Sequence, residues 1–391
     1  MPSKEKEIIL LANSLGVLGL LSINIYLPGL PFLIKYFHTT PQNLKLSISL
    51  FLLGFAASQF IWGSLSERFG RKKPILIALF LACVGTVITM LAPNIITFNA
   101  GRFIEGTGIG CASVLTRALL TDTFDKIRLS AAISYLTTAA NIMPAIAPII
   151  GGYLLLWLGW RFIFLFLLIY SGIILFGFYK KLVETNKSLR EHLSLTEAIQ
   201  DYWTIIRHRE FMGYILPYLF LSGGMFGYYA AAPFIFISFL HISAQHYGFI
   251  QILTVVSYIV STNLSVQLMR WFNMDKIILW GTFLGIIAGI CLVVFYQFLD
   301  LSIFTVMLPM MIFCFAAGLV ASNANAGALS TLSQKAGSCG AIISALLYGL
   351  SALFSAIIAN QDLSSLKPLT IYICVIALFA CIGFLKLIYV R

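Results

Sequence analysis

Charged residues are scarce in this sequence. They make up 10% of its 391 residues, whereas hydrophobic residues make up 60%. A soluble domain is about half apolar and about a quarter charged. The composition therefore excludes an ordinary soluble domain and predicts an all-α polytopic membrane protein.

Motifs for metal, disulfide or nucleotide chemistry are also missing. No two of the seven cysteines are spaced as Cys-x-x-Cys, the five histidines form no His-x-x-x-His pattern, and no Gly-x-x-x-x-Gly-Lys-Ser/Thr loop occurs. Zinc sites and ATP-driven transport depend on such motifs. No nucleophile–base pattern appears either, so we expect no metal, no bound cofactor and no enzyme active site.

The formal net charge of +11 does not indicate a nucleic-acid partner, because the basic residues fall in short loops between apolar runs. That placement is typical of cytoplasmic loops in membrane proteins. With the N-terminus inside, the outer loops hold only Lys35, Lys45, Arg161 and Lys367. We therefore expect both termini in the cytoplasm and the lipid bilayer as the surrounding partner.

A helix needs about 20 apolar residues to cross a bilayer. By that measure the sequence predicts twelve spans, at about 8–28, 45–65, 74–92, 95–119, 130–156, 160–179, 211–239, 246–268, 276–297, 302–328, 338–359 and 368–389. The one long connection, from Lys180 to Glu210, has mixed charge, and its apolar residues follow the spacing of an amphipathic helix. The predicted organisation is a six-helix bundle at 1–179, a cytoplasmic linker at 180–210 and a second six-helix bundle at 211–391.

A short charged loop, Gly63 to Lys73, lies between the second and third apolar runs. Its glycines suit a close helix contact and a left-handed turn, and its charges can pair so as to hold helices together in one conformation. The alternative is a solvated basic loop. The residues proposed for this conformational role are Gly63, Glu67, Arg68, Gly70, Arg71 and Lys72.

The loop after the eighth run repeats part of this pattern. Residues 268–279 align with residues 65–76 at a phenylalanine, a turn-forming residue and a lysine. The match falls at the same place in each half of the chain, which favours two parallel halves joined by a central linker.

The fourth run contains the only two charges that we place well inside the membrane, Arg102 and Glu105. They are three residues apart and so share a helix face. Ionisable residues within a membrane are costly and are functional candidates by default. Gly106 and Gly110 lie four apart and would let another helix approach closely. The alternative is an internal ion pair that only stabilises the bundle.

Two other spans carry unusual residues. The fifth contains Pro144, Pro148, Gly151 and Gly152, which would bend the helix and let it pack tightly, although an ordinary kinked span is the alternative. The first span closes with the segment from Ser22 to Pro31, which contains Asn24 and Tyr26. An asparagine cannot titrate, and a hydrogen bond to another helix is the alternative to a role in binding.

These motifs resemble those of the major facilitator superfamily. The Gly63 to Lys73 loop resembles the signature loop between helices two and three, and Arg102 with Gly106 resembles the fourth-helix motif of drug:proton antiporters. The Ala-Pro-x-x-Gly-Gly form that ends at Gly152 resembles the bicyclomycin-resistance branch. The resemblance implies two pseudo-symmetric six-helix bundles, alternating access, a monomer, a bacterial inner membrane and a part for Arg102 in proton coupling.

The sequence also departs from that branch at two important positions. Asn24 stands where the branch commonly has an aspartate, and Glu105 stands where the fourth-helix motif usually has an uncharged glutamine. Either Glu105 has taken over proton coupling, or coupling is altered or absent.

Further polar or aromatic residues within spans could line a binding cavity, although each of them could instead be a packing or hydrogen-bonding residue. With Asn24 and Tyr26, the substrate-binding candidates are Gln59, Asn141, Tyr228, Tyr229, Gln251, Tyr258 and Asn323.

The predicted function is secondary active transport, with proton-driven efflux of amphipathic drugs or small metabolites. One alternative is a dedicated exporter or importer of an anionic or zwitterionic metabolite, such as a siderophore or an amino-acid derivative, with or without proton coupling. Another is a membrane receptor or assembly factor that transports nothing.

Overall fold

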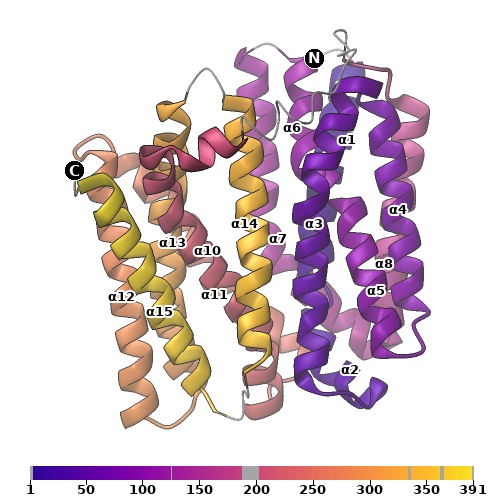
Figure 1. Ribbon diagram of the computed structural model, residues 1–391. Helices are drawn as coiled ribbons and strands as arrows, with labels where there is room; N and C mark the ends of the chain where they lie inside the picture. The colour runs from indigo at the N-terminus through magenta and orange to yellow at the C-terminus, as the bar shows by residue number, and fades with distance from the viewer. Residues whose placement is uncertain (1–2, 125, 187–201, 333–335, 362–364, 390–391) are drawn as a thin grey trace. The chain divides into compact units, whose positions relative to one another are not determined.

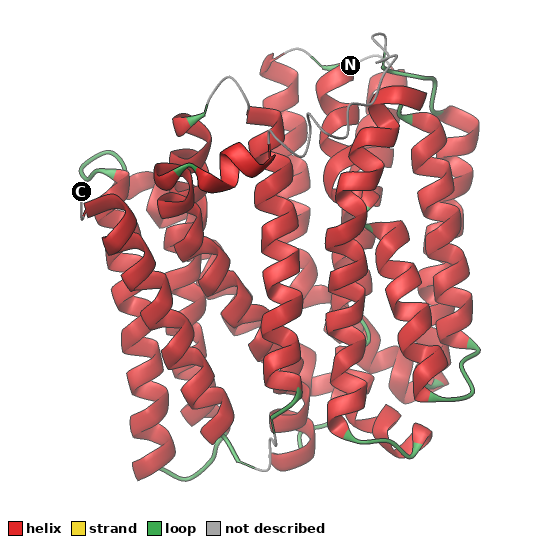
Figure 2. Ribbon diagram, in the orientation of Figure 1, coloured by secondary structure: helices red, strands yellow, loops and turns green. Residues whose placement is uncertain are grey.

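The computed structural model describes residues 3–124, 126–186, 202–332, 336–361 and 365–389, and these residues form helices joined by loops, with no strand among them (Figures 1 and 2). Eleven helical segments in this described part are long and apolar enough to cross a membrane. The fifth predicted span falls on a further long helix, whose portion Ile142–Leu158 is apolar. The predicted all-helical membrane fold is confirmed.

The first half of the chain contains the helices that match predicted spans one to six. In chain order the elements are α1 (Ser3–Asn24), a 3₁₀ turn (Leu27–Gly29), α2 (Leu30–Phe37), α3 (Pro41–Phe69), α4 (Lys72–Met90), α5 (Ile95–Ile109), α6 (Cys111–Thr123), α7 (Lys126–Leu158) and α8 (Trp160–Lys181). The fourth span is thus two helices in sequence, which meet at Gly110.

The second half begins with α10 and matches predicted spans seven to twelve. Its elements are α10 (Arg209–Pro233) with a π-helical turn (Phe234–Phe239), α11 (Ala244–Leu268), α12 (Met274–Phe298), α13 (Ile303–Thr331), α14 (Ala336–Ala359) and α15 (Lys367–Phe384) with a π-helical turn (Leu385–Tyr389).

The chain divides into two compact units. The first comprises Met1–Leu193 with Ala244–Gly248, and the second comprises Ser194–Ser243 with Phe249–Arg391. The main division falls within the segment proposed as a linker, and residues 187–201 of that segment lie outside the described part of the chain. The first residues of α11 group with the first unit, which the sequence did not suggest.

The same helix pairings occur inside each unit. In the first unit α4 packs on α5 and α8, and α1 packs on α6 and α7. In the second unit α12 packs on α13 and α15, and α10 packs on α13 and α14. These pairs correspond span by span, so the internal repeat is a repeat of packing. The two aligned loops differ locally, because Gly70 has a φ of 83° and Asn273 has a φ of −70°.

Glycines bring α5 close to both of its neighbours. A Cβ atom on Gly106 would collide with the backbone carbonyl of Phe51 on α3, and one on Gly85 of α4 would collide with the backbone of Glu105. A Cβ on Gly110 would likewise meet Phe55 and Ser58 of α3. The predicted close approach at Gly106 and Gly110 is confirmed, and it fixes the position of α5.

Substitution of Gly106 by alanine is expected to destabilise the protein, because the obstructing atoms belong to backbone and cannot rotate away. Overpacking of this kind costs about 1–3 kcal/mol. The matched control is Gly172→Ala on α8, since nothing lies within 4 Å of a Cβ built there. Thermal unfolding of the purified proteins should show a lower midpoint for G106A and an unchanged or higher midpoint for G172A. Equal midpoints would contradict the packing argument.

Candidate functional site

A buried ion pair lies on α5. Arg102 Nη1 donates to Glu105 Oε2 at 2.7 Å, and both side chains are 0% exposed. The second guanidinium nitrogen, Nη2, donates to the carbonyl oxygen of Ser22 on α1 at 2.9 Å. The pair therefore connects the fourth span to the first, as intramembrane charges that are retained must find such partners.

Aromatic rings enclose the guanidinium group of Arg102. Its Cζ atom lies 4.3 Å from the ring centroid of Tyr26 and 4.2 Å from that of Phe51, with Phe164 at 5.9 Å. The Tyr26 hydroxyl is 3.1 Å from Ser47 Oγ, within hydrogen-bonding distance. Cation–π attraction is strongest where the cation is desolvated, so the rings help to hold this charge inside the membrane.

Part of the hydrogen-bonding capacity of this cluster is unused. Arg102 Nε has no hydrogen-bond partner among the described residues, and the Ser22 hydroxyl lies beside the Glu105 carboxyl without a well-aligned hydrogen bond to Oε1. A carboxylate oxygen that is buried without a partner carries a desolvation cost, which protonation of that oxygen would relieve. Oε1 is thus an atom that could take up a proton while Oε2 still faces Arg102.

The other first-half candidates lie in different surroundings. Asn24 is buried, and its side-chain nitrogen donates to the Leu20 carbonyl of its own helix at 2.8 Å. Gln59 is also buried, and neither of its amide atoms has a partner in the described part of the chain. The side chain of Asn141 lies outside the described residues. Lys45, predicted from the sequence to lie on the outer side of the membrane, is fully buried near the start of α3.

A polar and aromatic group in the second unit joins three of the second-half candidates. Gln251 Nε2 on α11 donates to the Tyr228 hydroxyl on α10 at 3.1 Å, and that hydroxyl donates to Met307 Sδ at 3.5 Å. The rings of Tyr228 and Tyr229 are 5.6 Å apart. Gln251 is buried, and its Oε1 atom has no partner among the described residues. A ligand with a hydrogen-bond donor and an aromatic face would suit this arrangement.

Asn323 takes part in a contact between α11 and α13, and the backbone carbonyl of Tyr258 lies at the same contact, against Gly318. The Tyr258 carbonyl accepts hydrogen bonds from Ser261 and Thr262, each at 2.9 Å. Asn323 Nδ2 donates to Ser265 Oγ at 2.6 Å and to the Leu319 carbonyl at 2.9 Å. The hydrogen bonds of Asn323 thus favour a packing role.

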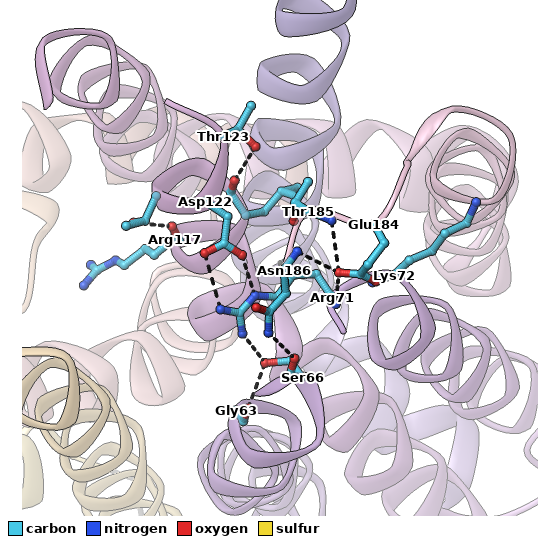
Figure 3. A network of polar contacts seen from close by, with 12 residues as sticks. Gly63, Ser66, Arg71, Lys72, Arg117, Asp122, Thr123, Glu184, Thr185 and Asn186 are labelled. Carbon is cyan, nitrogen blue, oxygen red and sulfur yellow. Dashed lines mark hydrogen bonds and ion pairs between the residues drawn. The ribbon is translucent and has the colours of Figure 1, made fainter. Parts of the chain in front are cut away.

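The loop between α3 and α4 forms a network with residues that are distant in sequence (Figure 3). Arg71 Nε donates to Asp122 Oδ2 at the end of α6 at 2.7 Å, and Arg71 Nη1 donates to Ser66 Oγ at 2.7 Å. Ser66 Oγ in turn donates to the Gly63 carbonyl at 2.8 Å. Arg71 therefore joins the third, fourth and second spans at one end of the first unit.

A second carboxylate caps the start of α4. Glu184, just beyond α8, accepts hydrogen bonds from the backbone N–H of Arg71 at 2.7 Å and of Lys72 at 3.1 Å (Figure 3). Partial burial raises the pKa of the Glu184 carboxyl, but hydrogen bonds from the backbone N–H groups of Arg71, Asn186, Lys72 and Thr185 outweigh it, so the net pKa is below its ordinary value.

Gly70 permits this capping. Its φ is 83°, and a Cβ atom there would collide with the Glu184 carboxylate. The remaining residues of the loop motif lie at the end of α3, where Glu67 is in the last turn and the Arg68 guanidinium is 5.1 Å from the Phe69 ring centroid.

The fifth-span motif lies in an unbroken helix. Both Pro144 and Pro148 are inside α7. A Cβ atom on Gly151 would collide with the Ile25 carbonyl, and one on Gly152 would lie 2.6 Å from the Ala244 carbonyl. The two glycines therefore allow other segments of the first unit to touch the backbone of α7.

Sequence reasoning missed Asp122 and Glu184. They are 51 and 113 residues away from Arg71, and each looks like a solvated acid at the end of a span. Within the described residues, no group of three His, Cys, Asp or Glu side chains could hold a metal ion.

The fold is that of a polytopic helical protein with an ion pair buried among its spans. Residues 13–356 match the Major Facilitator Superfamily, and the chain belongs to this family of transporters, which are not enzymes. It is a multi-pass membrane protein whose function implies a small-molecule substrate and a surrounding lipid bilayer.

Two bacterial relatives and one solved structure illustrate the kinship. The chain is 24% identical to a bicyclomycin resistance protein homolog of Haemophilus influenzae, over 94% of this chain and 93% of that protein. It is 23% identical to multidrug resistance protein D of Escherichia coli, over 94% and 90%. A crystal structure of a D-xylose-proton symporter matches with a TM-score of 0.76 at 18% identity, over 98% of each chain, which shows a common fold.

Replacing Glu184 by glutamine should lower stability at neutral pH, since a capping carboxylate is worth about 1 kcal/mol or less. Because its folded-state pKa is depressed, its contribution is fully present above the ordinary pKa of 4.5 and is lost as the pH falls through the lower folded-state value. Thermal midpoints of wild type and E184Q should thus differ at pH 7 and converge on acidification below pH 4.5. A difference that is independent of pH would contradict the capping role.

Proposed function

We propose that this protein is a proton-driven exporter of amphipathic small molecules that works by alternating access between its two units. The observation that supports the proposal best is the Arg102–Glu105 pair, an ion pair enclosed in the membrane with one carboxylate oxygen unused. The names of the relatives, which refer to bicyclomycin and multidrug resistance, favour drugs among amphipathic substrates.

Glu105 is the group proposed to carry the proton. Protonation would remove the negative charge that faces Arg102 and leave its cation with the Ser22 carbonyl and the rings of Tyr26 and Phe51. Because Arg102 contacts α1, a change in its pairing changes what holds α1 and α5 together. That change in helix contacts is the proposed link between proton uptake and the conformational cycle.

The substrate is proposed to contact uncharged side chains. The second-half spans between residues 211 and 268 contain no Asp, Glu, Lys or Arg. Tyr229 offers an aromatic face beside Tyr228, and Gln251 Oε1 offers a hydrogen-bond acceptor. In the first half, Gln59 and Asn24 offer amide groups, and the Tyr26 ring lies 4.3 Å from Arg102 Cζ.

The Arg71 network is proposed to favour one conformational state. Arg71 bonds to Asp122, while Glu184 binds the backbone at the start of α4, and both contacts depend on the ends of several spans remaining together. Movement of any one of these ends would break charge-assisted hydrogen bonds, which are about twice as strong as neutral ones. Pro144 and Pro148 give α7 places to bend during the same movement.

A second candidate function is transport of one particular anionic or zwitterionic metabolite, with altered or no proton coupling. The presence of Asn24, which cannot titrate, and of the buried cations Arg102 and Lys45 favours it. A receptor that transports nothing is less well supported, because the Arg71 network suits a protein that cycles. We further propose a bacterial inner membrane, cytoplasmic termini and a monomer.

Glu105→Gln should abolish gradient-driven transport. The amide preserves shape but cannot exchange a proton, so substrate accumulation in proteoliposomes with an imposed pH gradient should fall at least about tenfold. Glu7→Gln, which changes an exposed carboxylate paired with Lys181, is the control and should transport normally. An E105Q protein that still concentrates substrate with normal pH dependence would defeat proton coupling at Glu105 and favour the second candidate.

Tyr229→Leu should weaken recognition of aromatic substrates. Loss of a ring contact worth about 0.5–1.5 kcal/mol would raise KM about two- to tenfold, with little change in maximal rate. Tyr296→Leu, a partly exposed tyrosine of α12, serves as the matched control. The measurement is initial transport rate against substrate concentration, and equal KM values for the two variants would remove Tyr229 from the binding site.

A further inference from the structure

An apolar groove of about 420 Å³ lies in the second unit between α14 and α15, over α10. Both α14 and α15 pack on α10 but touch each other little (Figure 1). Its lining residues are Phe220, Phe354, Ile357, Ile358, Gln361, Pro368, Ile371, Tyr372, Val375, Ile376 and Phe379. All three helices are long and apolar enough to span a membrane, so lipid is the medium around them.

Stacked rings form the floor and walls of the groove. The ring of Phe220 on α10 stacks on that of Phe379 at 5.8 Å between centroids and lies 5.5 Å from that of Phe354. The Tyr372 hydroxyl donates to the Gly223 carbonyl on α10 at 2.7 Å. These contacts fix the rings of α14 and α15 against α10.

Two glycines of α10 make room for these rings. A Cβ atom on Gly223 would collide with the Phe354 ring, and one on Gly227 would collide with the Tyr372 ring. Because both rings pack directly against the backbone of α10, they leave the space between α14 and α15 open. The groove is therefore preformed, and a preformed site loses little free energy in ordering itself around an occupant.

The dimensions of the groove suit one lipid chain. From Pro368 to Phe379 the α15 wall runs for about 17 Å, at a rise of 1.5 Å per residue. That length is about one leaflet of a hydrocarbon core that is about 30 Å thick. Val375 is 42% exposed and Phe379 is 55% exposed, so the wall is open to its surroundings along its length.

One end of the groove is polar. Gln361 lines it, and Lys367, which is exposed, directly precedes the lining residue Pro368 at the start of α15. A lysine at the end of a transmembrane helix lies at headgroup level, where it attracts lipid phosphate. The polar end and the apolar length thus match the two parts of a phospholipid.

We propose that this groove is a binding site for one acidic phospholipid, with an acyl chain between α14 and α15 and its phosphate at Lys367. The lipid chain fills space that the side chains of the two helices leave open, and it contributes dispersion contacts that an empty groove would lack.

Native mass spectrometry of the delipidated full-length protein tests the site, with phosphatidylglycerol and phosphatidylcholine as the probes. Wild type should bind one phosphatidylglycerol more tightly than phosphatidylcholine. Val375→Trp, which fills the groove, should weaken phosphatidylglycerol binding at least tenfold. Lys367→Gln should weaken phosphatidylglycerol binding about fivefold, which is the change expected when one lysine near a lipid surface is removed. The same variant should leave phosphatidylcholine binding unchanged.

Controls distinguish a specific site from the general lipid layer. Ile287→Trp on α12 adds a ring to another exposed membrane face, and Lys276→Gln removes another exposed cation at a helix end. Both should bind phosphatidylglycerol as wild type does. Losses equal to those of V375W and K367Q would overturn the proposal, as would full retention in V375W.

A crosslinking measurement on the wild-type protein tests the proposal without relying on variants that could fail to fold. A phosphatidylglycerol with a photoreactive acyl chain should crosslink mainly to peptides that contain Phe354–Gln361 or Pro368–Phe379. Crosslinks spread evenly over the exposed faces of α11 and α12 would show that the groove holds no particular lipid.

Discussion

The packing of the first unit depends on the contacts that stabilise the buried positive charge of Arg102. An unpaired cation within a membrane would cost a large amount of free energy. A carboxylate, a backbone carbonyl and two close aromatic rings surround this one. These partners come from α1 and the turn after it, from α3 and from α5, so the same contacts that neutralise the charge also join three helices. The tight glycine packing of α5 on α3 and α4 holds the pair in place.

The Arg71 network also pairs charged groups, in this case at the ends of the helices. There the charges are partly hydrated, and single ion pairs contribute little. The stability of the network comes instead from several hydrogen bonds made by the same groups. Arg71 donates to both Asp122 and Ser66, and the Glu184 carboxylate accepts from two successive N–H groups at the start of α4. Gly70 suits this position because its φ of 83° is one that other residues rarely adopt, and a Cβ atom there would displace the Glu184 carboxylate.

Much of the fold was predictable from the sequence, because the long apolar runs and their short loops have few other physical explanations. The proximity of Arg102 and Glu105 was predictable too, since a spacing of three residues fixes it on a helix. Asp122 and Glu184 were not, because contacts over 51 and 113 residues depend on how helices pack. The complete burial of Lys45 was not predictable either, because it depends on which helices pack around the start of α3. The pairing of Tyr228 with Gln251 also depends on helix packing, which a sequence pattern does not encode.

The similar pairings of helices in the two units contrast with an unequal distribution of charge. The charged side chains that are fully buried in the described part of the chain, Lys45, Arg102 and Glu105, all belong to the first unit. The two units thus share helix pairings but differ in the charges that their described interiors hold. In the second half, the buried positions of the described residues hold no charged side chain that a substitution would have to preserve. This half is therefore the part of the molecule in which new ligand preferences could evolve at the lowest risk to the buried ion pair.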